Sequence, residues 1–235
     1  MFSYNFDWTI VTSGKYFEWL VSGLKITVQL SLVSIVLAFI LGLFIAVLRM
    51  SHVRPARWFA AGYLEFFRNT PLLVQIFFWY FGSDKILPQA ARDWLYSVNF
   101  EFAAAAIALS IYTSAFIAED IRSGIRSIPK EQMETARSSG FSYVRSMLYI
   151  ILPQAVRIAV PPLINQFLNL TKNSSLAMTI GVAELTYQAR QVESYTFKGI
   201  EAFTAATLVY LAVSLLITGL VTIYSKKVLS PIGMR

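Results

Sequence analysis

The chain has 235 residues, of which 56% are hydrophobic and only 14% are charged. Because an average soluble domain carries roughly 25% charged residues, this composition excludes an ordinary soluble protein and predicts an all-α membrane protein. The net charge of +7 does not indicate nucleic-acid binding, since the basic residues lie beside apolar segments, where a lipid bilayer with anionic headgroups is the simpler partner.

The sequence contains about five apolar stretches that suit membrane-spanning helices of roughly 20 residues. Pro71 should break or kink the second of them, and we expect Pro153 and the pair Pro161-Pro162 to interrupt the fourth. Aromatic residues in the preceding segment, 1–21, are typical of an extracytoplasmic or interfacial region. The predicted spans are 22–50, 58–82, 102–122, 147–170 and 202–224, which together form one membrane domain over 22–224, followed by a tail, 225–235.

Lysine and arginine residues fall unequally on the two sides that five spans define. Eleven lie on one side and seven on the other. The eleven are concentrated in short loops, and short loops rich in lysine and arginine are cytoplasmic. We therefore predict that the N-terminus is outside and that the C-terminus and the loop of residues 129–147 are cytoplasmic.

The loop of residues 129–147 is predicted to contain two short helices. Pro129 can open the first, because the first turn of a helix needs no hydrogen-bond donor, and Gly140 permits a sharp turn before the second. Such a bent element can fill a socket on another protein, whereas an ordinary interfacial helix is the alternative. The residues expected to dock are Met133, Glu134, Ala136, Arg137, Gly140 and Phe141.

Polar residues at the end of the fourth span are candidates for a solute pathway. Amides inside a membrane need protein or water as partners, so a stripe facing water is expected, with helix-to-helix hydrogen bonding as the alternative. Lys172 adds a positive charge that can attract a carboxylate. The candidate pathway residues are Asn165, Gln166, Asn169, Lys172 and Asn173.

A second set of polar and small residues is a candidate for gating or packing. The third span carries small residues at four-residue intervals, which allow helices to approach closely, so packing within the chain is expected ahead of pore lining. Glu119 and Asp120 lie beside Arg122, where an ion-pair cluster and a gating role both remain open. This set comprises Arg68, Pro71, Ser110, Ser114 and Glu119.

Residues 134–153 read ETARSSGFSYVRSMLYIILP. The spacing resembles the EAA loop of permeases from ATP-binding cassette importers (E-A-A, three residues, G, nine residues, I-x-L-P), with Thr135 in place of an alanine. Four further stretches resemble motifs of the polar amino-acid permeases, with Asn69, Asp120 and Ser123 as departures. They are RNTPLLVQ (68–75), EDIRSGIRSIP (119–129), KNSSL (172–176) and GVAEL (181–185), and the resemblance covers about residues 23–224.

The resemblance implies a type I ABC importer permease fold in the bacterial inner membrane, with a coupling-helix loop. It implies pairing with a sister permease or a second copy, an ATPase dimer that holds ATP and Mg, and an extracytoplasmic solute-binding protein. Asn173 stands where relatives for basic and neutral amino acids often have aspartate, which favours glutamate or aspartate as the substrate.

The chain itself is expected to be no enzyme and to bind no cofactor or metal. It contains no G-x-x-x-x-G-K-[ST] phosphate loop, no H-E-x-x-H and no cysteine, so ATP hydrolysis would belong to a separate chain. A secondary transporter or channel driven by an ion gradient is the alternative, and a scaffold is a third. The sequence leaves open the exact amino acid, homodimer or heterodimer, and which subunit and which polar residues hold the solute.

Overall fold

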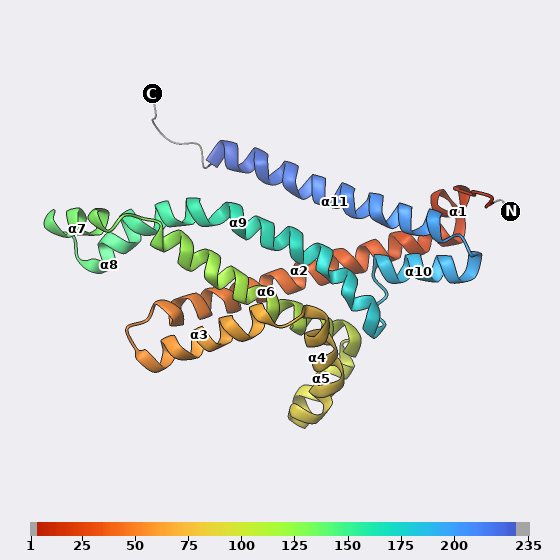
Figure 1. The fold of residues 1–235 in the computed structure, drawn as a ribbon, viewed down its shortest axis with the longest axis horizontal. Helices are drawn as coiled ribbons and strands as arrows, with labels where there is room; N and C mark the ends of the chain where they lie inside the picture. Colours follow the sequence, from red (N-terminus) through yellow and green to blue (C-terminus); the bar gives the residue numbers. More distant parts are fainter. Residues whose placement is uncertain (1–3, 229–235) are drawn as a thin grey trace. The chain divides into compact units, whose positions relative to one another are not determined.

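The computed structural model describes residues 4–228. Over these residues it consists of helices without a β-strand, as predicted (Figure 1). The predicted tail lies outside the described residues from position 229 onward, as do residues 1–3 of the amino-terminal segment. The elements are α1 (Thr9–Thr12), α2 (Gly14–Met50), α3 (Arg54–Asn69), α4 (Leu72–Ile86), α5 (Gln89–Ser97), α6 (Phe100–Arg126), α7 (Lys130–Ser138), α8 (Tyr143–Ser146), the π-helix η1 (Met147–Ile151), α9 (Leu152–Asn173), the 3-10 helix η2 (Ser174–Ile180), α10 (Leu185–Thr196) and α11 (Gly199–Val228).

Four helical stretches are long and apolar enough to cross a membrane, namely Gly14–Met50, Phe100–Arg126, Tyr143–Ile180 and Gly199–Val221. The break expected at Pro71 divides the second predicted span, because the chain forms two separate helices, α3 and α4, on either side of this residue. Only α4 is strongly apolar, and its 15 residues extend about 22 Å, short of a hydrocarbon core of about 30 Å.

The fourth span also differs from the expectation, because α9 continues through Pro161 and Pro162. The π-helical turn η1 ends at Ile151, two residues before Pro153, and its wider turn accommodates a residue that cannot donate the regular hydrogen bond. Ala155 and Ala159 are buried on α9, so packing holds the helix together where its own hydrogen bonds are missing.

The described residues form two compact units, which we describe separately. The first contains residues 4–34, 72–109 and 168–228, and the second contains residues 35–71 and 110–167. In the first unit α10 packs beside the beginning of α11 (Figure 1). Its core consists of Val11, Leu20, Leu185, Ala189, Val192, Ala202 and Ala206.

The amino-terminal segment is fastened to α11 by a buried carboxylate. Glu201 has no exposed surface and accepts hydrogen bonds from the backbone N–H of Asp7 at 2.9 Å and from the hydroxyl of Tyr4. Tyr4 also packs under the ammonium group of Lys198. Segments that are far apart in the sequence are thereby held together at the start of α11.

The second unit is organised around α6, which packs closely against α2. A Cβ atom added at Gly42 would lie 2.7 Å from Cγ2 of Ile117 and 2.9 Å from the carbonyl oxygen of Ser114. A Cβ atom at Gly124 would likewise meet the carbonyl oxygen of Ala155 at 2.9 Å. Both distances are shorter than ordinary contacts, so α6 approaches α2 and α9 at positions where one partner has no side chain.

We predict that Gly42→Ala destabilises the protein. The new methyl group has no space beside Ile117, and overpacking of this kind costs about 1–3 kcal/mol. The measurement is the midpoint of thermal unfolding in detergent. Gly219→Ala in α11 is the control, because its Cβ meets nothing within 4 Å, and its midpoint should not fall. Equal midpoints for the two variants would contradict the close packing of α2 and α6.

Candidate functional site

The loop between α6 and η1 forms a helical turn in the second unit. Pro129 precedes the first residue of α7, and Gly140 ends the helix with a left-handed φ of +87°. The N–H groups of Gly140 and Phe141 donate to the carbonyl oxygens of Arg137 at 3.0 Å and Ala136 at 3.1 Å. This pair of bonds is a Schellman motif, which favours glycine at the left-handed position.

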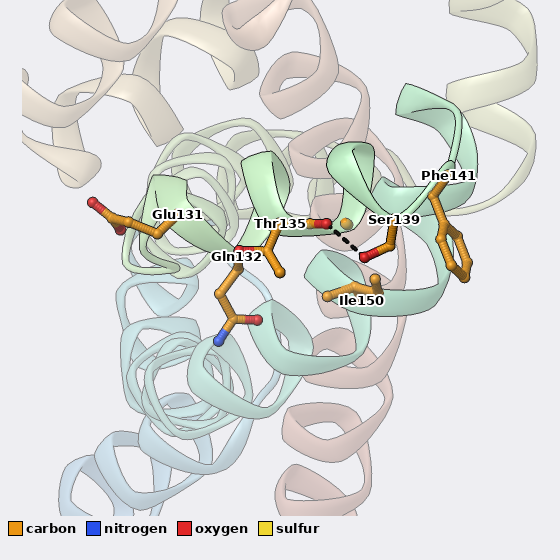
Figure 2. A pocket seen from close by; sticks show the side chains of 7 residues that line it. Glu131, Gln132, Thr135, Ser139, Phe141 and Ile150 are labelled. Carbon is orange, nitrogen blue, oxygen red and sulfur yellow. Dashed lines mark hydrogen bonds between the residues drawn. The ribbon is translucent and has the colours of Figure 1, made fainter.

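A shallow hollow of about 350 Å³ lies along this turn. Figure 2 shows Gln132, Phe141 and Ile150 around it, with Glu131 pointing away. At the end of α7 the hydroxyl of Ser139, the C-cap residue, donates to the carbonyl oxygen of Thr135 at 2.9 Å (Figure 2). The lining residues are Glu131, Gln132, Thr135, Ala136, Ser139, Phe141 and Ile150.

The structure divides the residues that we expected to dock. Met133 packs against the apolar cluster of Ile128, Ile151 and Ala155, and Ala136 is only 4% exposed. These two side chains therefore hold α7 onto its own chain and do not share an outward face with Arg137. The outward-facing members of the set are Glu134, Arg137, Gly140 and Phe141.

A second hollow, of about 330 Å³, lies in the first unit between the end of α9, α10 and α11. Its volume is at the lower end of the range of roughly 300–1,000 Å³ that is typical of small-ligand sites. Lys172 is its one charged lining residue, and the remaining polar groups are hydroxyls. The lining consists of Lys172, Ser175, Thr186, Phe203, Ala206, Thr207 and Tyr210.

A buried carboxylate stands behind this hollow at the start of α10. Glu184 has no exposed surface and accepts hydrogen bonds from the backbone N–H groups of Tyr187 at 2.8 Å and Thr186 at 3.0 Å. The hydroxyl of Tyr210 donates to the same carboxylate at 2.7 Å. Burial raises the pKa of Glu184, while these hydrogen bonds act in the opposite direction.

Close packing against α2 positions this carboxylate. A Cβ atom at Gly23 would lie 2.8 Å from Cα of Leu185, so α2 and α10 are in backbone contact. The hydroxyl of Thr27 on α2 accepts the N–H of Leu185 at 3.1 Å and lies 3.5 Å from the Glu184 carboxylate. Three helices thus meet at Glu184.

The candidate pathway residues have different surroundings. Asn165, Asn169 and Lys172 are exposed on α9, and the two asparagine side chains make no hydrogen bond to another described residue. Gln166 instead donates to the carboxylate of Asp120 on α6 at 2.8 Å, which corresponds to the helix-to-helix alternative. Asn173 is half-buried at the end of α9.

Of the candidate gating residues in the second unit, Arg68 and Pro71 are exposed, whereas Ser114 is buried and Glu119 is half-buried. Ser114 is fully buried and hydrogen-bonds the hydroxyl of Tyr63 at 2.7 Å. Arg68 lies over the ring of Phe116 at 5.5 Å. Glu119 forms an ion pair with Arg122.

One further candidate of this set shares the packed environment of Ser114. Ser110, at the start of the α6 portion of this unit, is 4% exposed.

The sequence did not indicate three site residues of the first unit, namely Glu184, Thr186 and Tyr210. The GVAEL stretch was the one signal for Glu184, because glutamate is an unusual N-cap residue. A lone tyrosine in an apolar span is typical of core packing, so Tyr210 gave no signal.

The comparisons with known proteins agree with this architecture. Residues 38–230 match the family described as binding-protein-dependent transport system inner membrane component. The chain therefore belongs to this family and is a multi-pass membrane permease, a transport component of the ATP-binding cassette importers. This confirms the resemblance and the type I importer permease fold predicted from the sequence.

Individual relatives are permeases for amino acids. The probable glutamine ABC transporter permease protein GlnM of Bacillus subtilis (strain 168) is 44% identical over 200 residues, which cover 85% of this chain and 88% of the relative. The glutamate/aspartate import permease protein GltJ of Escherichia coli (strain K12) is 34% identical over 224 residues, covering 93% and 91%. A crystal structure of an amino acid ABC transporter with histidines superposes with a TM-score of 0.85 at 32% identity, covering 96% of this chain and 100% of that chain.

We predict that Gly140→Ala strains the turn between α7 and α8. No atom lies within 4 Å of the new Cβ, so the effect of about 1 kcal/mol arises from the left-handed backbone alone. The measurement is amide hydrogen exchange of Ser139 to Ser142, which should become faster. Gly62→Ala is the control, because its Cβ is equally free and its helical backbone has no positive φ; faster exchange in neither variant would contradict the assignment.

Proposed function

We propose that this permease subunit of an amino-acid ABC importer carries acidic amino acids, glutamate or aspartate, across the bacterial inner membrane. The observation that carries the substrate proposal is the hollow in which Lys172 is the one charged lining residue. An ammonium group surrounded by hydroxyls offers donors to a carboxylate, and no lining carboxylate repels it. Asn173, at the end of the same helix, is neutral as well.

The names of the relatives support two substrates. GltJ is a glutamate/aspartate permease, whereas GlnM is described as a probable glutamine permease. Glutamate and glutamine differ only in the side-chain group, which is a charged carboxylate in one and a neutral amide in the other. The positive charge of Lys172 favours the carboxylate, and it is the basis on which we choose glutamate over glutamine.

The proposed machine contains further chains. A sister permease or a second copy would complete the pathway, because the four long helices of one chain enclose little of it. An extracytoplasmic solute-binding protein would deliver the amino acid. Two copies of an ATPase would bind ATP and Mg, and their closure would move the permeases between two states. The N-terminus would lie outside and the C-terminus in the cytoplasm.

The ATPase would dock on the outward side of α7 and at the turn after it. Glu134, Arg137 and Phe141 are exposed there, with Phe141 at 41% exposure. The Schellman motif at Gly140 makes this surface stiff, and a stiff element transmits displacement with little loss. Met133 would transfer the force inward, because it joins α7 to the apolar cluster that contains Ile151 of η1 and Ala155 of α9.

We predict that Lys172→Gln lowers the affinity for glutamate and affects glutamine much less. A hydrogen bond to a charged group contributes about 1.5–3 kcal/mol, which corresponds to roughly a 10–100-fold change in the binding constant. The measurement is ATP-driven uptake of both amino acids into proteoliposomes that contain the complete importer. Lys25→Gln, which removes an exposed charge from α2, should leave both rates unchanged, and an equal loss for both amino acids in Lys172→Gln would count against acidic specificity.

We predict that Arg137→Glu uncouples transport from ATP hydrolysis. Reversal of an exposed charge at a protein interface replaces an attraction by a repulsion of several kcal/mol, so uptake should fall by at least about tenfold. The measurements are amino-acid uptake into proteoliposomes, substrate-stimulated ATPase activity and co-purification of the ATPase. Arg57→Glu is the control, because Arg57 is also exposed but lies in α3, outside the loop of residues 129–147. Full coupling in Arg137→Glu would sink the docking assignment.

A further inference from the structure

Besides Lys172, the hollow is lined by two hydroxyl groups that are hydrogen-bonded to each other. We call these two hydroxyls the second polar wall of the hollow. Tyr210 of α11 and Thr186 of α10 provide them, and their oxygen atoms are 3.1 Å apart. The hydroxyl of Tyr210 also lies 2.7 Å from the carboxylate of Glu184. The three groups therefore form one hydrogen-bonded chain, with Glu184 at its buried end.

Glu184 is held in a single orientation. Its two oxygen atoms each accept a backbone N–H of the first turn of α10, from Tyr187 at 2.8 Å and from Thr186 at 3.0 Å. A backbone N–H group can only donate, so both carboxylate oxygens of Glu184 must act as acceptors. Its orientation is thus a property of the fold.

This orientation determines the direction of both hydroxyls. A hydroxyl has one hydrogen atom, and Tyr210 uses its own hydrogen to donate to Glu184. In the contact between Thr186 and Tyr210 the Tyr210 oxygen must therefore accept, and Thr186 uses its only hydrogen as the donor. Toward a third group in the hollow, both oxygen atoms can act only as acceptors.

Lys172 has the opposite hydrogen-bonding character to the two hydroxyls, because its ammonium group has three donors and no acceptor. The hollow thus combines a charged donor for an anion with a pair of directed acceptors for a cation. An α-amino acid carries both a carboxylate and an ammonium group, and the ammonium group offers donors only. The chemistry of the two walls matches glutamate, with its side-chain carboxylate at Lys172 and its α-ammonium group at the two hydroxyls.

We propose that Thr186 and Tyr210 bind the α-ammonium group of the transported amino acid and that buried Glu184 is the positioning residue that keeps both hydroxyls in the acceptor state. This inference rests on the proposed function, because it takes the Lys172 hollow as a substrate site. It adds a recognition rule, namely that the permease selects against carboxylates without an amino group. Glutarate, which has the carbon skeleton of glutamate without the amino group, is the analogue that isolates this contact.

The experiment measures binding of radiolabelled glutamate to the purified importer complex in lipid nanodiscs, with unlabelled glutamate, glutamine or glutarate as competitor. Thr186→Val keeps the shape of the side chain and removes the acceptor, and Tyr210→Phe removes the other. In both variants the preference for glutamate over glutarate should shrink about tenfold, because glutamate binds more weakly while glutarate is unaffected. Thr186→Ser should restore the preference, since the hydroxyl returns.

Glu184→Gln tests the positioning role. The variant removes the negative charge and brings an amide donor into competition for Tyr210, so the same preference should shrink. Thr218→Val is the control, because Thr218 lies on α11 outside the lining of the hollow, and its hydroxyl donates to the carbonyl oxygen of Ser214 at 2.8 Å. Its preference should equal that of the wild type.

The outcomes separate this inference from the function on which it rests. If the wild type binds neither glutamate nor glutamine, the proposed function fails and the inference fails with it. If the wild type binds glutamate but Thr186→Val and Tyr210→Phe keep the full preference over glutarate, only the inference is overturned. An equal weakening of glutamate and glutarate would overturn it too, because that pattern is expected of a purely structural role.

Discussion

The close approach of helix backbones is the constraint on which the rest of this structure depends. In a bilayer the hydrophobic effect does not press helices together, so contact has to come from van der Waals packing and hydrogen bonds. Gly42 and Gly124 provide that contact for α6 in the second unit, and Gly23 provides it between α2 and α10 in the first. The polar chemistry of the first unit follows from the last of these contacts, because it brings Thr27 and the start of α10 to Glu184.

Buried carboxylates in the first unit are balanced by neutral donors. Glu184 and Glu201 have no exposed surface, and each accepts hydrogen bonds from backbone N–H groups and from a tyrosine hydroxyl. Such pairing satisfies a charge that would otherwise be costly to bury, and among the described contacts Lys172 forms no ion pair with either carboxylate. For Lys172 the consequence is that its charge remains available to a solute.

The sequence predicted the features that depend on composition and on single backbone-restricting residues. Long apolar runs indicated membrane helices, Pro71 indicated the break between α3 and α4, and Pro129 and Gly140 indicated the ends of α7. Tertiary packing decided the rest. The prolines of α9 did not stop the helix, and Met133 turned inward although its spacing was compatible with an outward face. The short amphipathic helices α5 and α10 were missed, because their polar residues resemble those of a loop.

The hydroxyl chain behind the Lys172 hollow was beyond the reach of sequence reasoning for a different reason. Its members come from positions 27, 184, 186 and 210, on three helices, and no periodicity connects them. Only the backbone contact at Gly23 and the packing of α10 on α11 bring them together. Glu184, at the N-cap of α10, is recognisable as a site residue only when its neighbours in the fold are known.

The prolines of α9 have a mechanical consequence. In a regular helix the N–H groups of residues 161 and 162 would bond to the carbonyl oxygens of Arg157 and Ile158, but Pro161 and Pro162 have no N–H to give. Two neighbouring backbone hydrogen bonds are therefore absent within a single turn of α9. Because backbone hydrogen bonds stiffen a helix, α9 resists bending least at this turn.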